Sequence, residues 1–190
     1  MNRWIRALLP LLLVVLLAAC GGGSAVTPTP LALTQNYVSG DGTISFQYPP
    51  DWVATAVSGQ VTIANSQAAF ESPSPAPGQF LTRMIVGPIA SVSGLSADSK
   101  PLDVVTFFVE SLSSSAITFS APVETPIGTR RAGRVDGTGA DGQGVILALD
   151  MGDGNYSIIS VTCSPGELSR FEGTLEAILQ TLVYVPPKGS

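Results

Sequence analysis

The sequence of 190 residues contains no histidine. Histidine is the commonest general base in catalysis, and its imidazole is the ligand of most transition-metal sites. The absence excludes histidine-dependent serine and cysteine triads. The sequence also lacks a Gly-x-Ser-x-Gly elbow, a Ser-x-x-Lys pair and a phosphate-binding glycine loop that ends in lysine. We therefore expect no enzyme, no metal and no cofactor.

Cysteine is almost as scarce, because only Cys20 and Cys163 are present. If Cys20 is modified, as argued below, no disulfide can form within the chain. Cys163 ends an apolar strand pattern, and we interpret it as a packed small hydrophobic side chain rather than a reactive thiol.

Basic residues are few, with 9 Lys and Arg against 14 Asp and Glu and a formal charge of −5. Removal of residues 1–19 takes away Arg3 and Arg6 and brings the charge to −7. Nucleic-acid binding needs clustered Lys and Arg, and the chain has no such stretch. We therefore expect no nucleic-acid partner.

A single long apolar run covers residues 7–19, and Cys20 follows it. The run is too short to span a bilayer as a mature helix, and Arg3 and Arg6 precede it as in a signal peptide. The small residues 18 and 19 followed by cysteine resemble the lipobox of bacterial lipoproteins. That resemblance implies a signal peptide at 1–19, a diacylglycerol on the Cys20 sulfur, and a place on the extracytoplasmic face of the cell membrane or on an outer membrane.

The next segment, residues 20–37, combines three glycines with a Thr-Pro repeat and has little to bury. We interpret it as a flexible tether with a reach of roughly 20–25 Å, although an ordered strand can begin from Leu31 onward. The remaining residues, 38–186, number about 150 and suffice for one domain.

Hydrophobic alternation and turn residues predict a series of short strands. The glycine-rich links 137–144 and 152–155 are typical of hairpin turns. The predicted strands cover 43–48, 52–56, 60–64, 80–86, 117–123, 127–136, 145–151, 156–163 and an edge strand at 183–185.

Two segments have helical spacing instead. One helix is predicted at 101–114, with Pro101 in its first turn and Asp103 at its positive end. A second follows a predicted capping box between Ser164 and Glu167. Its apolar stripe consists of Leu168, Phe171, Leu175, Ile178, Leu179 and Leu182. The order of elements predicts an α+β fold, with a central, mainly antiparallel sheet flanked by helices.

The segment Ile-Ser-Phe-Gln-Tyr-Pro-Pro-Asp-Trp at 44–52 resembles the opening of the PsbP-like family. Further matches are Pro126-Ile127-Gly128, Ala132-Gly133-Arg134, Asn155-Tyr156, Leu175-Glu176-Ala177-Ile178-Leu179 and Thr181-Leu182. The resemblance implies an α-β-α sandwich. The family includes an extrinsic photosystem subunit, a Ran-binding import factor and bacterial lipoproteins. Most members dock onto larger assemblies, and they share no catalytic constellation.

Arg130, Arg131 and Arg134 form the only basic cluster of the mature chain. Strand alternation sends Arg130 and Arg134 to one face and Arg131 to the other. The pair is either part of a docking surface for an acidic partner or an ordinary set of solvated strand positions. Trp52, with Tyr48, either lines a ligand pocket or closes one end of the core.

The turn that contains Asp150, Asp153 and Asn155 places three oxygen-bearing side chains together. Its spacing departs from the EF-hand pattern, so we favour a plain hairpin over a calcium site. Asp136 and Asp141 nearby are interpreted in the same way.

These observations favour a lipid-anchored, non-enzymatic domain that docks onto a protein partner and is held at the membrane through Cys20. The alternative is a lipoprotein that binds a small ligand and delivers it to a membrane partner. An enclosed pocket would favour the ligand, whereas a filled core with an exposed apolar patch would favour docking.

Overall fold

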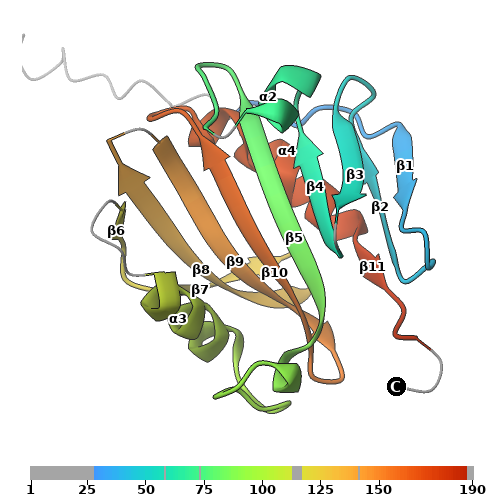
Figure 1. Cartoon of the computed structure of the whole chain (residues 1–190), viewed down its shortest axis with the longest axis vertical. Coiled ribbons are helices and arrows are strands. Elements are labelled where there is room, and N and C mark those ends of the chain that lie inside the picture. The colour runs from blue at the N-terminus through green and yellow to red at the C-terminus, as the bar shows by residue number, and fades with distance from the viewer. Residues whose placement is uncertain (1–27, 58, 73, 113–116, 141, 188–190) are drawn as a thin grey trace, which may run out of the picture.

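The structure is a computed structural model that describes residues 28–57, 59–72, 74–112, 117–140 and 142–187. Cys20 and the predicted signal peptide lie outside these residues. In the described part an eight-stranded sheet dominates, with the strand order β3-β4-β5-β10-β9-β8-β6 and with β7 also paired to β8 (Figure 1). Every pairing in it is antiparallel. The strands are β3 (Val53–Val57), β4 (Gln60–Ala64), β5 (Phe80–Pro88), β6 (Ile117–Phe119), β7 (Val123–Ile127), β8 (Arg130–Gly139), β9 (Gly142–Gly152) and β10 (Asn155–Cys163).

A second, three-stranded sheet has the order β1-β2-β11, from β1 (Gln35–Val38), β2 (Ile44–Tyr48) and β11 (Val183–Tyr184). β1 begins inside the segment expected to be a tether. The turn from β1 to β2 is fixed by the Asp41 carboxylate, which accepts hydrogen bonds from the hydroxyls of Ser39 and Thr43 and from the Thr43 amide. These bonds lower the pKa of Asp41 to about 2.

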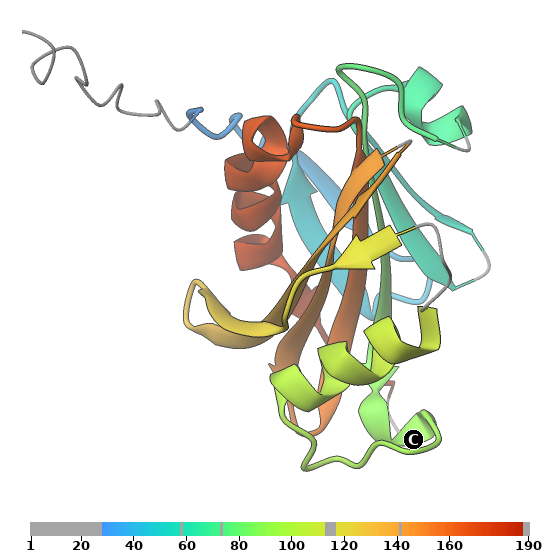
Figure 2. The same ribbon diagram turned by 90° about the vertical axis from the view of Figure 1, so that its left-hand side faces the viewer.

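The two long helices lie on opposite faces of the large sheet (Figure 2). α3 (Pro101–Leu112) begins at the predicted proline and covers one face, which we call the α3 face. α4 (Leu168–Thr181) covers the other, the α4 face. The short helix α2 (Gln67–Glu71) and the 3₁₀ turn η1 (Ile89–Ser91) complete the chain. The α+β fold with helices on both faces of an antiparallel sheet is therefore confirmed.

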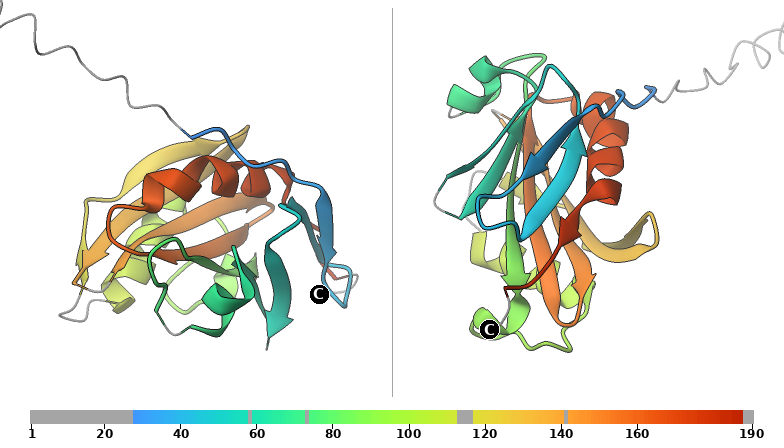
Figure 3. Two further views of the ribbon diagram at one scale, coloured as in Figure 1. Left: turned by 90° about the horizontal axis from the view of Figure 1, so that it is seen from above. Right: turned by 90° about the vertical axis from the view of Figure 1, so that its right-hand side faces the viewer.

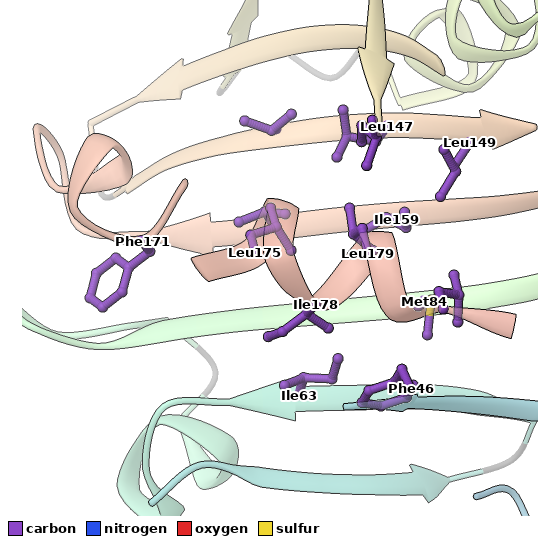
Figure 4. Packing of buried hydrophobic residues seen from close by; sticks show 14 of the residues in the cluster. Phe46, Ile63, Met84, Leu147, Leu149, Ile159, Phe171, Leu175, Ile178 and Leu179 are labelled. Carbon is purple, nitrogen blue, oxygen red and sulfur yellow. The ribbon is translucent and has the colours of Figure 1, made fainter. Parts of the chain in front are cut away.

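The main core lies between α4 and the sheet. Side chains of α4 point onto strands β9, β10, β5 and β4, and Phe46 of β2 closes the far side (Figure 4). All six residues of the predicted apolar stripe are buried, which confirms the prediction for this helix. Burial of this stripe away from water stabilises the domain.

A smaller core lies between α3 and strands β8, β9 and β10. Gly133 of β8 makes this contact possible, because a Cβ atom there would lie 2.3 Å from the backbone oxygen of Pro101. Glycine thus lets the start of α3 approach the sheet closely. A third cluster, Ala64, Ala69 and Leu81, holds α2 against another part of the same face.

The structure corrects four local predictions. Ser164 and Glu167 form no capping box, because the Ser164 hydroxyl donates to the Pro75 carbonyl and the Glu167 carboxylate accepts from the Gly78 amide. The strand predicted at 117–123 is divided into β6 and β7, and Pro122, which cannot donate to a ladder, lies between them.

The strand predicted at 127–136 also begins too early. Ile127 ends β7, the chain turns at Gly128 with φ of 60°, and β8 begins at Arg130. The glycine-rich link 137–144 is mostly strand, because Gly139 pairs with Gly142. Its predicted hairpin turn is therefore shorter than expected, and Asp141 lies outside the described residues.

The first described residues lie against α4 (Figure 3). The Leu31 amide donates to the Thr174 hydroxyl at 3.1 Å, and Pro30 packs beside Gly173. The chain therefore enters the domain across the α4 face. Among the described residues, no helix combines the length and apolar character that crossing a membrane requires.

Candidate functional site

A hollow of about 700 Å³ lies on the α3 face and is open to solvent on one side. Strands β5, β10, β9 and β8 form its floor. The last residue of α3, Leu112, forms one wall together with Ile117 and Phe119, the two ends of β6. Ser74 and Pro75 form another wall. We call this hollow the Arg83 groove.

The pairing register explains which side chains form the floor. Arg83 of β5 lies opposite Ser160 of β10, and Ser160 lies opposite Ile146 of β9. In the neighbouring row, Thr162 of β10 lies opposite Gly144 of β9. Because side chains alternate along a strand, all these residues belong to the α3 face.

Two glycines leave parts of the groove floor without side chains. A Cβ atom on Gly144 would lie 2.3 Å from the Val161 carbonyl oxygen, so a side chain does not fit there. Gly137 lies under Phe119 and Ile117, whose side chains would be 3.0–3.1 Å from a Cβ atom. The bare backbone of β8 and β9 leaves the space that the groove occupies.

Among the described residues that line the groove, Arg83 alone is charged. Its side chain is half-buried, and within the part of the chain that the structure describes its guanidinium has no hydrogen bond and no ion pair. Arginine normally uses its five donors on carboxylate, phosphate or carbonyl oxygens. An unpartnered guanidinium on the floor of a groove is therefore available to an anionic group from outside.

The groove wall is apolar and exposed. Leu112 and Ile117 have 53% and 49% of their surface exposed, and Ile85, two residues from Arg83 on the same face, has 53% exposed. Exposed large hydrophobic residues that gather beside a groove are typical of interaction sites.

Cys163 contributes backbone to the groove, but its side chain belongs to the α4 core. It is fully buried, and burial raises the pKa of its thiol to about 11. The interpretation of Cys163 as a packed apolar side chain is confirmed.

Arg130 and Arg134 lie on the α4 face, away from the groove. Arg130 donates to the Leu179 carbonyl and, at 3.0 Å, to the Leu182 carbonyl, at the end of α4. Burial lowers the pKa of Arg130. Its cation lies where the negative end of the helix dipole favours it.

Arg134 is held by Asp136 of its own strand, at 2.7 Å, and by Glu172 of α4. Burial opposes the charge, but the two carboxylates outweigh this effect and raise the pKa of Arg134. Arg131 lies on the other face and pairs with Glu124 at 3.3 Å, with both side chains 58% exposed. The structure thus brings Arg130 and Arg134 onto one face and gives each an internal acceptor.

Trp52 is 7% exposed and packs on Phe80 with ring centroids 5.3 Å apart. Tyr48 packs against the same core from its edge. The structure places Trp52 within the main core and not among the residues that line the groove.

The turn at 150–155 is built by its own hydrogen bonds. The Asp150 carboxylate accepts from the Gly152 amide at 2.9 Å, and the Asn155 side-chain amide donates to the carbonyls of Gly152 and Asp153. Asp136 pairs with Arg134. Within the described ranges, no three His, Cys, Asp or Glu residues are placed to hold a metal ion.

Sequence reasoning missed Arg83. One signal was present, because alternation along Phe80–Pro88 puts Arg83 between Leu81 and Ile85 on one face of a strand. A charge flanked by two apolar residues on the same face of a central strand indicates a site where the covering layer is incomplete.

A scan against models of protein families found no match, and a comparison with curated protein sequences found none either. Solved structures are similar in fold. The Ran-binding protein Mog1p of Saccharomyces cerevisiae is 14% identical with a TM-score of 0.53, and the match covers 81% of this chain and 97% of Mog1p. LpqN of Mycobacterium tuberculosis, involved in cell envelope biogenesis, is 15% identical with a TM-score of 0.50, and the match covers 80% of this chain and 91% of LpqN.

Cyanobacterial PsbP (CyanoP) of Synechocystis sp. PCC 6803 is 12% identical with a TM-score of 0.48, over 88% of this chain and 99% of CyanoP. At such identities a likeness shows fold alone. The matches to Mog1p and LpqN show that the domain has the α+β sandwich that the resemblance to the PsbP-like family implied.

Proposed function

We propose that this chain is a lipid-anchored extracytoplasmic domain that docks a segment of a partner protein in the Arg83 groove and catalyses no reaction. The observation that carries the proposal is the groove itself, an open hollow of about 700 Å³ with exposed apolar walls, opposite a well-filled core. Mog1p is a Ran-binding protein and LpqN is involved in cell envelope biogenesis. A role in protein binding is in line with the first of these, and a place in the envelope with the second.

The shape of the groove favours a protein segment over a small ligand. A volume of about 700 Å³ lies in the range of small-molecule sites, but such sites bury roughly 70–90% of their ligand. A hollow that is open along one side covers only part of a small molecule. A segment that remains attached to a larger partner needs no such enclosure, because the partner covers the open side.

The chemistry of the groove supports a binding role. The described residues of its lining include no carboxylate that could act as a base on the hydroxyls of Ser160 and Thr162, and the sequence contains no histidine. The one thiol near it, Cys163, stays protonated at neutral pH because its pKa is about 11. The groove can therefore orient a partner by charge and shape.

The anchor and the groove are compatible in space. The chain enters across the α4 face at Pro30 and Leu31, whereas the groove lies on the α3 face. A lipid on Cys20 would hold the domain from the side that does not carry the groove. The anchor is tested by the intact mass of the native protein and by the variant Cys20→Ala, which should move from the membrane fraction to the soluble fraction. Native protein with residues 1–19 intact and no acyl mass would contradict the anchor.

Docking is tested by a photoreactive amino acid placed in the groove at Thr162 in cells that make the full chain. We expect crosslinks to a protein partner from this exposed position. The matched control is Ser169, an exposed residue of α4 on the opposite face. Equal crosslinking from both positions, or none from Thr162, would contradict docking in the groove.

A further inference from the structure

We propose that the Arg83 groove selects an extended acidic segment, in which a carboxylate pairs with the Arg83 guanidinium and an apolar side chain about six residues away packs on Leu112 and Ile117. This inference rests on the proposed docking function and adds the chemistry of the partner.

The expected charge of the partner segment follows from the lack of an acceptor for Arg83 among the described residues. Arg130, Arg131 and Arg134 each have acceptors within the domain, and Arg83 has none among the described residues. A neutral segment laid over the groove would remove water from an unpaired cation, which is unfavourable. A carboxylate replaces that water with two parallel hydrogen bonds, the geometry that guanidinium favours.

The length of the segment follows from the strand order. From Arg83 on β5, the floor crosses β10, β9 and β8 and reaches β6, where Ile117 stands beside Leu112. Neighbouring strands lie about 4.8 Å apart, so this path is about 19 Å long, which an extended chain covers in about six residues. The segment therefore crosses the strands rather than adding to the edge of the sheet.

The middle of the groove limits what lies between the two anchors. Ser160 and Thr162 present exposed hydroxyls there, and Gly144 presents bare backbone. These groups suit small or polar residues that can exchange hydrogen bonds with them. The result is a recognition pattern with an acidic end, a polar middle and an apolar end.

A second copy of this chain is a poorer occupant. Each processed copy would carry a formal charge of −7, so two copies repel one another over long range. A separate acidic segment faces the same overall repulsion, but it is short, and its carboxylate finds the single unpaired arginine of the groove.

The experiment selects eight-residue peptides from a random display library on the full chain held in lipid nanodiscs. Wild-type bait should enrich peptides with Asp or Glu about six residues from Leu, Ile, Phe or Trp. The R83E bait should enrich Lys or Arg at the acidic position instead. The R131E bait, with the same change of charge at an exposed arginine outside the groove, should select the wild-type pattern.

The dissociation constant of one selected peptide, measured with each variant, shows how much Arg83 contributes to binding. Loss of a charged hydrogen-bonded pair should weaken binding to R83Q about tenfold or more, whereas R131Q should bind within about twofold of wild type. A Thr162→Trp variant, which fills the groove, should abolish binding. Circular dichroism confirms that each variant is folded.

The outcomes separate the two proposals. Peptides that bind wild type but not T162W, and that show no acidic preference and no response to R83E, overturn the acidic segment and leave docking in place. Equal binding to wild type and T162W overturns both. A groove that binds decanoate and no peptide, or full chain that pairs through the groove in sedimentation velocity, overturns the choice of a partner segment.

Discussion

The two faces of the large sheet are formed by the same strands but are covered to different extents. On the α4 face, α4 covers a continuous core, and both arginines, Arg130 and Arg134, are tied to acceptors in or beside the helix. On the α3 face, α3 and α2 each cover only part of the sheet, and among the described residues Arg83 has no hydrogen-bond or ion-pair partner. One face is covered within the chain, and in the proposed docking a partner covers the other.

Strand β5 shows how one segment serves both purposes. Phe80 and Met84 turn toward α4 and are buried, whereas Arg83 and Ile85 belong to the α3 face and remain partly exposed. The alternation of a strand separates the residues that stabilise the domain from those that are available for binding. Changes on the two faces should therefore have separate effects on stability and binding.

The largest expected effect is on the α4 face. Phe80→Ala removes a fully buried ring that packs against Trp52 and Phe171, and it should lower the free energy of unfolding by about 3–5 kcal/mol. Leu112→Ala on the groove wall, half-exposed at the end of α3, should change it by less than about 0.5 kcal/mol. Urea unfolding followed by circular dichroism measures both. Similar losses of unfolding free energy in the two variants would contradict the expected difference between the two faces.

A smaller effect is expected where α3 meets the sheet. Gly133→Ala places a Cβ atom against the Pro101 backbone, so α3 must shift, and we expect a loss of about 1–3 kcal/mol. Gly87→Ala on β5 is the control, because nothing lies within 4 Å of its Cβ position. Calorimetric melting temperatures compare the two. An unchanged melting temperature for Gly133→Ala would mean that α3 is not seated closely on β8.

The next effect compares the stability contributions of Arg130, which is bonded within the domain, and of Arg83, which has no such bond among the described residues. Arg130→Gln loses charged hydrogen bonds to the Leu179 and Leu182 carbonyls, and we expect about 1–2 kcal/mol lower stability. Arg83→Gln removes no internal bond and should leave stability within about 0.5 kcal/mol. Denaturant midpoints of the two variants decide this. Marked destabilisation by Arg83→Gln would show that Arg83 is structural.

The smallest effect concerns Cys163, whose side chain lies in the α4 core and whose backbone lines the groove. Its thiol pKa is raised from 9 to about 11 by burial, so the thiolate is suppressed up to pH 9 and increases only as the pH rises toward 11. Native protein should resist iodoacetamide at pH 8, whereas protein in urea reacts fully. Peptide mass spectrometry reads the modification at this residue. Rapid labelling of the native state would mean that the groove opens into the core.

The fold class could be predicted because it depends on local patterns. The apolar stripe of α4 and the proline that begins α3 act within one or two helical turns. The prediction of a capping box between Ser164 and Glu167 was wrong because both side chains bind the loop before β5. This loop, residues 75 to 78, is far away in sequence. A contact between distant segments overrides a local capping preference.

The groove could not be predicted because it depends on strand order. Arg83 and Ser160 become neighbours only because β5 pairs with β10 across 77 residues of sequence. Gly137 and Gly144 were interpreted as turn residues, but their pairing makes them part of the floor. No periodicity in one segment reveals which strand lies next to it.

The contact of Pro30 and Leu31 with α4 also has a mechanical consequence. In the proposed anchored state, tension from the membrane enters the domain at Gly173 and Thr174, and tension from a docked partner enters at the opposite surface of the sheet. The two forces then act across the thickness of the sandwich rather than along an edge. The side chains packed between α4 and the sheet would bear this load together. The hydrogen bonds between β1 and β2 would then not break one after another.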